Sequence, residues 1–213
     1  MNTSHRRIAL RGLVCLLAVS AFSACALSGR PAQPTPATFV LEVPVQGAPA
    51  AAATDLVLKV SMPVAAPAFA SSRMAYIEQP YRIDYFARNE WADAPARMLR
   101  TSLTQHLTNS GLFRFVFANA AGIDESVRLD SEITELVQVF SQTSSEVHLA
   151  VRFYFVDVAR RTILMSETIS VTEPATARDP YAGVVAANRA LQRVLDQLVT
   201  LLHDPVMALA RSG

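Results

Sequence analysis

The stretch from Tyr81 to Phe117, YRIDYFARNEWADAPARMLRTSLTQHLTNSGLFRFVF, carries the pattern that decides the fold. Its first six residues, as far as Phe86, are rich in aromatic and β-branched side chains, which is typical of a β-strand. We expect the polar run 88–90 to end this strand. Residues 112–117 return to strand composition, and 113, 115 and 117 are phenylalanines that we assign to the core. The stretch therefore predicts a strand, a helix and a second strand.

The predicted helix has recognisable ends and one apolar face. Asp93 can cap its start, and Pro95 suits the first turn, where a missing N–H costs nothing. Gly111 can take the left-handed conformation that follows many helices. Three leucines spaced four residues apart form the apolar stripe: Leu99, Leu103 and Leu107. Because such a stripe must be buried against another element, we expect the rest of the chain to supply a sheet.

Three later segments alternate apolar and polar residues with a period of two, the pattern of strands with one buried face. They cover 127–140, 146–158 and the residues from Ile163 to Val171, and short polar turns separate them. In the first segment we place Gln138 on the polar face and these residues on the buried face: Val127, Leu129, Ile133, Val137 and Val139. Glu135 and Glu167 interrupt the apolar faces and are expected at strand ends, bulges or an opening of the core.

The remaining elements complete a two-layer arrangement. Earlier strands are expected at 39–43 and 55–61, with little regular structure over 62–72 and a hairpin turning at 79–80. A last amphipathic helix should begin with the Asp179 cap and Pro180, run to about Leu202 and be limited by Pro205. We therefore predict one α+β domain over residues 38–205, with a mainly antiparallel sheet and two amphipathic helices packed on one face.

The N-terminus resembles a bacterial lipoprotein signal. A basic start and a short apolar stretch precede Phe22-Ser23-Ala24-Cys25, which is similar to the lipobox. We expect residues 1–24 to be the signal peptide, Cys25 to carry the lipid, and 25–37 to form a proline-rich tether. The alternative is an ordinary secretory signal cut near Ala24, with Cys25 incidental.

Composition and charge exclude several classes of function. The net charge is +1, and removal of residues 1–24, which contain three arginines and no acidic residue, would change it to −2. No basic run is longer than Arg160-Arg161, so we expect no nucleic-acid partner. Nucleotide-binding, hydrolase and metalloprotease motifs are absent from the sequence. We therefore predict no catalytic residues, no cofactor and no metal site.

A few polar and aromatic residues are candidates for a site. His106, His148 and His203 are scattered singly, and His106 is expected at the boundary of a helix face. Asp130 and Glu132 would share the solvated side of a strand. Trp91, the only tryptophan, is expected to staple the helix start onto the sheet; contact with a partner is the alternative. Exposed tyrosines could bind a partner or lipid: Tyr76, Tyr81, Tyr85 and Tyr154.

Residues 81–95, Met98-Leu99 and 110–113 resemble the core motif of the ABC-type transport auxiliary lipoproteins. The shared features are an aromatic strand, the N-x-W of Asn89 and Trp91, a proline at the helix start, and a small-Gly-x-Phe exit. The likeness covers nearly all of residues 25–203. It gives no catalytic residue and assigns a defined role only to Cys25, while Asn89 and Trp91 are candidates for partner contact.

The resemblance implies a function at the cell envelope. Members of that family accompany an ABC ATPase, a permease and a substrate-binding protein of the mammalian-cell-entry (MCE) type. They move phospholipids or other hydrophobic compounds between the inner and outer membranes. Ala26, in place of the aspartate that retains lipoproteins in the inner membrane, implies the outer membrane, facing the periplasm.

Two other hypotheses, and one further property, stay open. The first is an envelope-assembly lipoprotein that binds a cell-wall or outer-membrane biogenesis partner. The second is a lipid-modifying enzyme, which would require converging His, Ser and Asp side chains in a deep pocket. Assembly into a homo-oligomer is also left open.

Overall fold

The computed structural model describes residues 35–44 and 50–212. Cys25, the expected signal peptide and nearly all of the expected tether lie outside the described residues. The elements, in chain order, are β1 (Ala37–Phe39), β2 (Val57–Val60), β3 (Val64–Ala65), the 3-10 helix η2 (Pro67–Phe69), β4 (Arg73–Gln79), β5 (Arg82–Trp91), α2 (Pro95–Asn109), β6 (Phe115–Phe117), β7 (Val127–Phe140), β8 (Ser145–Asp157), β9 (Thr162–Pro174) and α3 (Pro180–Ser212).

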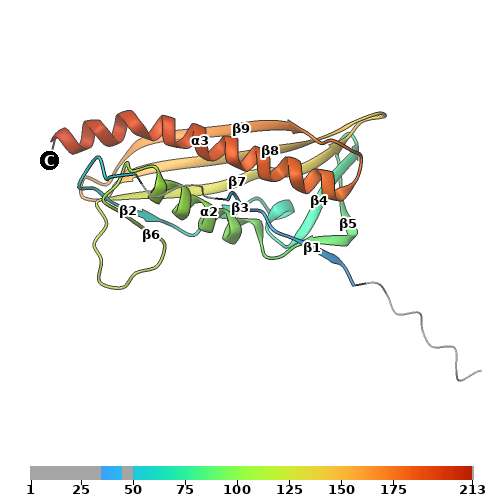
Figure 1. Ribbon diagram of the computed structural model, residues 1–213, viewed down its shortest axis with the longest axis horizontal. Coiled ribbons are helices and arrows are strands. Elements are labelled where there is room, and N and C mark those ends of the chain that lie inside the picture. Colours follow the sequence, from blue (N-terminus) through green and yellow to red (C-terminus); the bar gives the residue numbers. More distant parts are fainter. Residues whose placement is uncertain (1–34, 45–49, 213) are drawn as a thin grey trace, which may run out of the picture. The chain divides into compact units, whose positions relative to one another are not determined.

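The long strands β7, β8 and β9 form the predicted antiparallel meander, and shorter strands extend the sheet from the other edge of β7. Along that edge β2, β3 and β4 follow one another, each parallel to β7. The β4–β5 hairpin then continues the sheet, β1 pairs parallel with β5, and β6 with β2 (Figure 1). The predicted α+β class is confirmed, with a sheet that is mixed because its short pairings are parallel.

Both helices cover the same face of this sheet (Figure 1). The stripe of α3 packs on β8 and β9, where Phe153 and Phe155 are fully buried. The fully buried leucine and valine side chains of α3 are Leu191, Val194, Leu195, Leu198, Leu202 and Val206. Since each such side chain contributes about 1.5–3 kcal/mol by leaving water, this layer contact is a principal source of stability. Within the described residues, no helix is both long and apolar enough to cross a membrane.

A β-bulge in β7 reverses the faces assigned to its second half. The pairing with β8 shifts between Ile133 and Glu135, so one residue of β7 has no partner. Leu136 and Gln138 therefore point to the helices, opposite Leu149 and Val147, whereas Val137 and Val139 lie on the other face. The expectation that Glu135 marks a bulge is confirmed, and the face assignments of Val137, Val139 and Gln138 were wrong.

A second bulge, at the start of β9, changes the face on which the first residues of the third meander strand lie. The pairing of β8 with β9 shifts at Leu164, which turns Ile163 away from the helices and leaves it 61% exposed. Glu167 pairs opposite Phe153 in an unbroken part of the ladder and is exposed on the edge strand, so it marks neither a bulge nor a strand end.

The strand that begins the central motif is longer than expected. Residues 88–90 do not end it, because β5 pairs with β1 over 89–91 and Trp91 N–H donates to the Ser72 carbonyl. The strand expected at 39–43 forms instead at Ala37–Phe39, as β1. The helix cap is Ala94 rather than Asp93, whose carboxylate accepts from Ala94 N–H and pairs with Arg97.

Three further expectations were wrong. The segment 62–72 contains β3 and η2, because β3 finds a place beside β7. Phe115 is 47% exposed, whereas Phe113 and Phe117 are buried. The helix α3 continues through Pro205 to Ser212, since Val206 on its far side is fully buried in the core and keeps this turn packed.

Candidate functional site at the hairpin end of the sheet

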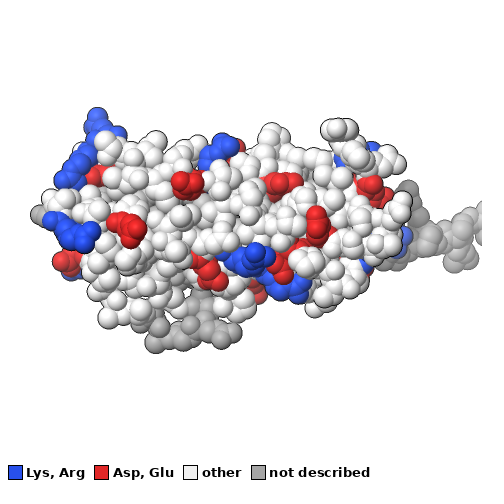
Figure 2. All heavy atoms as spheres, turned by 90° about the horizontal axis from the view of Figure 1, so that it is seen from above, with Lys and Arg blue, Asp and Glu red and all other residues white. Residues whose placement is uncertain are grey.

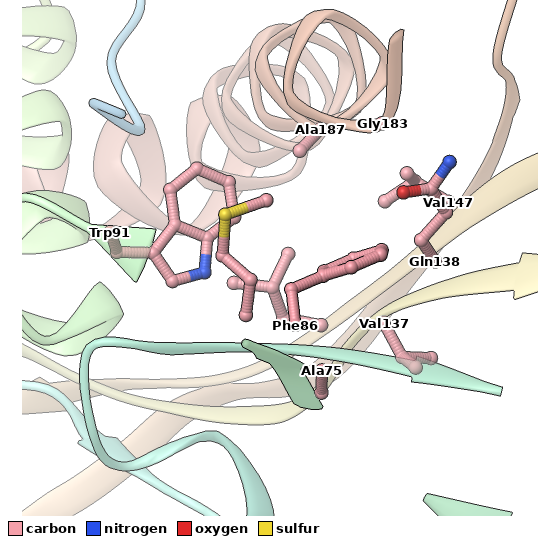
Figure 3. Close-up of a pocket in the computed structure, with 10 residues that line it drawn as sticks. Ala75, Phe86, Trp91, Val137, Gln138, Val147, Gly183 and Ala187 are labelled. Atoms are coloured by element: carbon pink, nitrogen blue, oxygen red, sulfur yellow. The ribbon is translucent and has the colours of Figure 1, made fainter. Parts of the chain in front are cut away.

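Trp91 lies at the junction between β5 and α2 and is 5% exposed. Its ring lines a cavity of about 20 Å³, room for about one water, between the β4–β5 hairpin and the first turns of α3 (Figure 3). Met74, Phe86 and Leu136 form apolar walls of the same cavity. The ring is therefore part of the core at the end of β5, next to the start of α3, which agrees with a core role for Trp91.

Gln138 is the polar group of this cavity, and sequence reasoning missed it. Its amide nitrogen donates to Ser145 Oγ at 3.0 Å and to the Asp179 carbonyl at 3.1 Å. Its Oε1 atom is buried and has no hydrogen-bond partner among the described residues. Gly183 makes room for the amide, because a Cβ at that position would collide with Oε1. The run Leu136-Val137, which breaks the period of two, was the available signal for the bulge.

Gln138 connects the end of β7 to the start of α3. Asp179 caps that helix as predicted, with Oδ1 accepting from Ala182 N–H at 2.9 Å. Ser145 Oγ donates to the Ala177 carbonyl at 3.0 Å and thereby fixes the loop before the cap. One buried amide and one hydroxyl therefore set the position of the first turn of α3 over the sheet.

Aromatic rings form a cluster that extends from Phe86 of this cavity to the surface. The centroids of Tyr76 and Phe86 are 4.6 Å apart, and Phe140 meets Tyr76 edge-on at 5.9 Å. The Arg178 guanidinium lies 5.6 Å from the Phe140 ring centroid, within reach of a cation–π interaction. The three rings line a surface groove of about 360 Å³ together with Glu78, Arg178 and Pro180.

Asn89 lies two residues before Trp91 but lines a different recess. It is half-buried, opposite Ala37 of β1, beside a groove of about 430 Å³ that Arg73 and Tyr85 also line. The Arg73 guanidinium covers the Tyr85 ring at 3.5 Å, and the Tyr85 hydroxyl donates to the Ala68 carbonyl. Asn89 is thus accessible for partner contact, whereas Trp91 is enclosed.

Ion pairs join many of the charged side chains of the described domain. Figure 2 shows acidic and basic residues interspersed over the visible face. Asp130 and Glu132, on the face of the sheet away from the helices, pair with Arg128 and Arg152. This is the solvated sheet face that the sequence predicts, with no carboxylate pair free for acid–base chemistry at that place.

The histidines form surface and boundary contacts. His106 bridges the two helices, with Nε2 3.2 Å from Asp196 Oδ1, which fits the expected boundary position. His148 lies between Glu146 and Glu135, at 2.7 and 3.4 Å. In the part of the chain that the structure describes, no group of three or more His, Cys, Asp and Glu residues could hold a metal ion.

Two carboxyl groups have a shifted pKa. The Arg97 side chain, followed by the Ala94 N–H, lowers the pKa of Asp93 at the start of α2. At the β8–β9 turn, the Arg160 N–H and then its guanidinium lower the pKa of Asp157, whose side chain is buried. Both groups stabilise turns and neither lies in the cavity or the grooves described above, so these shifts have a structural cause.

Comparison with protein-family models identifies the family of this chain. A family model described as "ABC-type transport auxiliary lipoprotein component" matches residues 39–199. This chain belongs to the ABC-type transport auxiliary lipoprotein family. The match contains the N-x-W motif, the helix α2 and the meander, and it confirms the resemblance on which the sequence analysis relied. A comparison with curated proteins finds none that matches.

Solved structures show the same fold. A Xanthomonas campestris protein described by the family DUF330 is 20% identical, with a TM-score of 0.72 over 82% of this chain and 99% of that one. A second structure, of an uncharacterized protein, is 12% identical with a TM-score of 0.65 over 79% and 99%. A hypothetical protein from Chlamydia trachomatis is 10% identical, with a TM-score of 0.50 over 72% and 99%. At these identities the likeness concerns the fold alone.

Proposed function

We propose that this auxiliary lipoprotein is a non-catalytic accessory component of an MCE-type ABC transporter. That transporter would move phospholipids or other hydrophobic compounds between the inner and outer membranes. The family match over residues 39–199 is the observation that carries the proposal. The described side chains support a binding role, because the grooves beside β5 are lined by aromatic rings, with one arginine and one glutamate in each, rather than by a nucleophile with its base.

In this proposal Cys25 carries the acyl chains and the domain faces the periplasm from the outer membrane. Residues 1–24 would be removed and 25–37 would connect the membrane to the domain of residues 38–205. Each buried CH₂ contributes about 0.8 kcal/mol, so several acyl chains would hold the protein at the membrane for its working life. The lipid anchor then brings the grooves beside β5 near partners in the same envelope.

Asn89 is the proposed contact residue for the MCE-type protein. Its carboxamide can both donate and accept hydrogen bonds, and it lies at an accessible groove at the edge of β5. Because β1 already pairs with the main chain of β5 at this point, a partner loop would bind here through hydrogen bonds to the Asn89 side chain. Trp91 would act on the same contact from beneath, by fixing the end of β5.

The test is affinity purification of the tagged full-length protein from detergent-solubilised membranes. The proposal predicts co-purification of an ABC ATPase, its permease and an MCE-type protein, with loss of the MCE-type protein from Asn89→Asp and retention in a matched surface variant, Gln192→Glu on α3. Recovery of cell-wall or outer-membrane assembly proteins in their place would contradict the proposal and favour the envelope-assembly alternative.

A further inference from the structure

Tyr81 combines backbone strain with a completely exposed side chain. It follows Pro80 at the turn of the β4–β5 hairpin, and its φ is +67°. A turn with proline second and a positive φ third normally has glycine or asparagine at that third position, because other residues crowd their own carbonyl. The ring touches nothing that would offset this strain, because Tyr81 is fully exposed.

The tip around Tyr81 exposes apolar side chains. Ile83 is exposed beside it, and Pro80 is exposed on the other side. The nearest cation is already compensated, since Arg82 Nε lies 2.8 Å from Asp84 Oδ2. The apex has an amphipathic ring and an aliphatic side chain, which suit the headgroup zone of a membrane, where tyrosine is enriched; the exposed carboxylate of Glu78 lies two residues before Pro80.

The chain enters the described domain at the same end. β1, which starts at Ala37, pairs with Asn89 of β5 and lies at the end of the sheet where the β4–β5 tip and the start of α3 also lie (Figure 1). Asn89 is seven positions after Arg82, roughly 23 Å along a strand. The twelve residues 25–36 can extend to roughly 40 Å. A lipid-anchored tether therefore leaves the tip enough freedom to reach the membrane surface.

We propose that the β4–β5 tip, through Tyr81 and Ile83, inserts into the headgroup region of the membrane that anchors the chain. This inference rests on the proposed lipid anchor, which supplies the high local concentration that one small tip requires. Contact at the tip turns the hairpin end toward the lipid, and it directs the opposite end, with the β8–β9 turn, away from that membrane. The tip thus orients the domain for its partners.

The test uses a tryptophan at the tip as a depth probe. The full mature protein with Tyr81→Trp is reconstituted into vesicles of phosphatidylethanolamine and phosphatidylglycerol, with and without brominated acyl chains that quench indole. The matched control is Ile163→Trp, which places the probe on a residue that is also exposed but lies beside the β8–β9 turn. The native protein, whose Trp91 is enclosed, supplies the background.

The inference predicts that the added emission of the Tyr81→Trp protein shifts to shorter wavelength on vesicles and is quenched by the brominated lipid, while the Ile163→Trp protein shows neither change. Equal behaviour of the two probes on protein that floats with the vesicles would overturn it and leave the anchor intact. Protein that does not float with the vesicles would contradict the anchor itself, and the tip contact with it. An emission shift only after addition of solubilised membrane proteins would assign the tip to a protein partner and overturn the lipid contact.

Discussion

At the scale of single residues, Trp91 joins a strand, a helix and the cavity beneath them. Because the ring is enclosed by the core, Trp91→Ala should lower the free energy of unfolding by about 3–5 kcal/mol, measured by urea titration. Trp91→Phe retains most of the apolar contact and should cost less. An unchanged midpoint for Trp91→Ala, together with lost partner binding, would show that the residue serves recognition and not the core.

Gly183 and Gln138 should behave as a coupled pair. A methyl group at Gly183 would meet the buried amide, so Gly183→Ala should lower the free energy of unfolding by about 1–3 kcal/mol through overpacking. The same change in a Gln138→Ala background should cost far less, because the colliding group is gone. Equal costs in both backgrounds, compared by a double-mutant cycle, would contradict the packing described here.

We expect the strained backbone of Tyr81 to lower the stability of the domain, while its exposed ring serves contact with the membrane. Tyr81→Gly relieves the left-handed backbone and loses no buried side-chain contact, so it should raise the free energy of unfolding by about 1 kcal/mol. Thermal and urea unfolding of the two proteins measure this difference. If Tyr81→Gly destabilises the domain instead, the tyrosine has a packing role within the fold and its strain is no sign of an external contact.

At the scale of elements, the β8–β9 turn depends on a buried carboxylate. The Arg160 N–H donates to Asp157 Oδ1 at 2.9 Å, and the Arg160 guanidinium pairs with Oδ2. Asp157→Asn removes these charge-assisted bonds and should lower the free energy of unfolding by about 1–3 kcal/mol at pH 7.

The same carboxylate gives that difference a pH dependence with a defined sign. Its pKa is lowered in the folded state, so its contribution is present above the unfolded pKa and is lost as pH falls through the lower, folded value. The native protein should therefore lose its advantage over Asp157→Asn in acid, below pH of about 4. An advantage that stays constant from neutral pH into that acidic range would mean that the ion pair does not form in solution.

Element types followed from the sequence more reliably than faces or ends. The period of two placed the first meander strand at 127–140, which are the bounds of β7. The same period failed beyond Glu135, because a bulge shifts every later side chain to the other face. Pro205 predicted the end of α3, but packing of Val206 against the core keeps the helix intact beyond it. Both errors arise from tertiary contacts that local patterns do not contain.

At the scale of the whole molecule, the two-layer α+β arrangement was predictable because two amphipathic helices and one-sided strands leave few ways to bury their apolar faces. The succession of β2, β3 and β4 along one edge of β7 was not, because short parallel pairings carry no sequence signal of their own. The candidate site likewise has some residues that the sequence predicts and one that it does not. Trp91 and Asn89 stand out in the sequence as candidates through their motif, whereas Gln138 was missed because it becomes buried only through the bulge.

The function proposed here depends most on acylation of Cys25. The decisive measurement is mass spectrometry of the mature N-terminus, made on separated inner and outer membranes, with Cys25→Ser as the control. The account predicts an acylated Cys25 as the first residue of the protein in the outer membrane, and a Cys25→Ser protein that no longer fractionates there. An unmodified N-terminus on protein free in the periplasm would contradict the lipid anchor, the membrane contact of Tyr81 and the proposed place of the domain in transport.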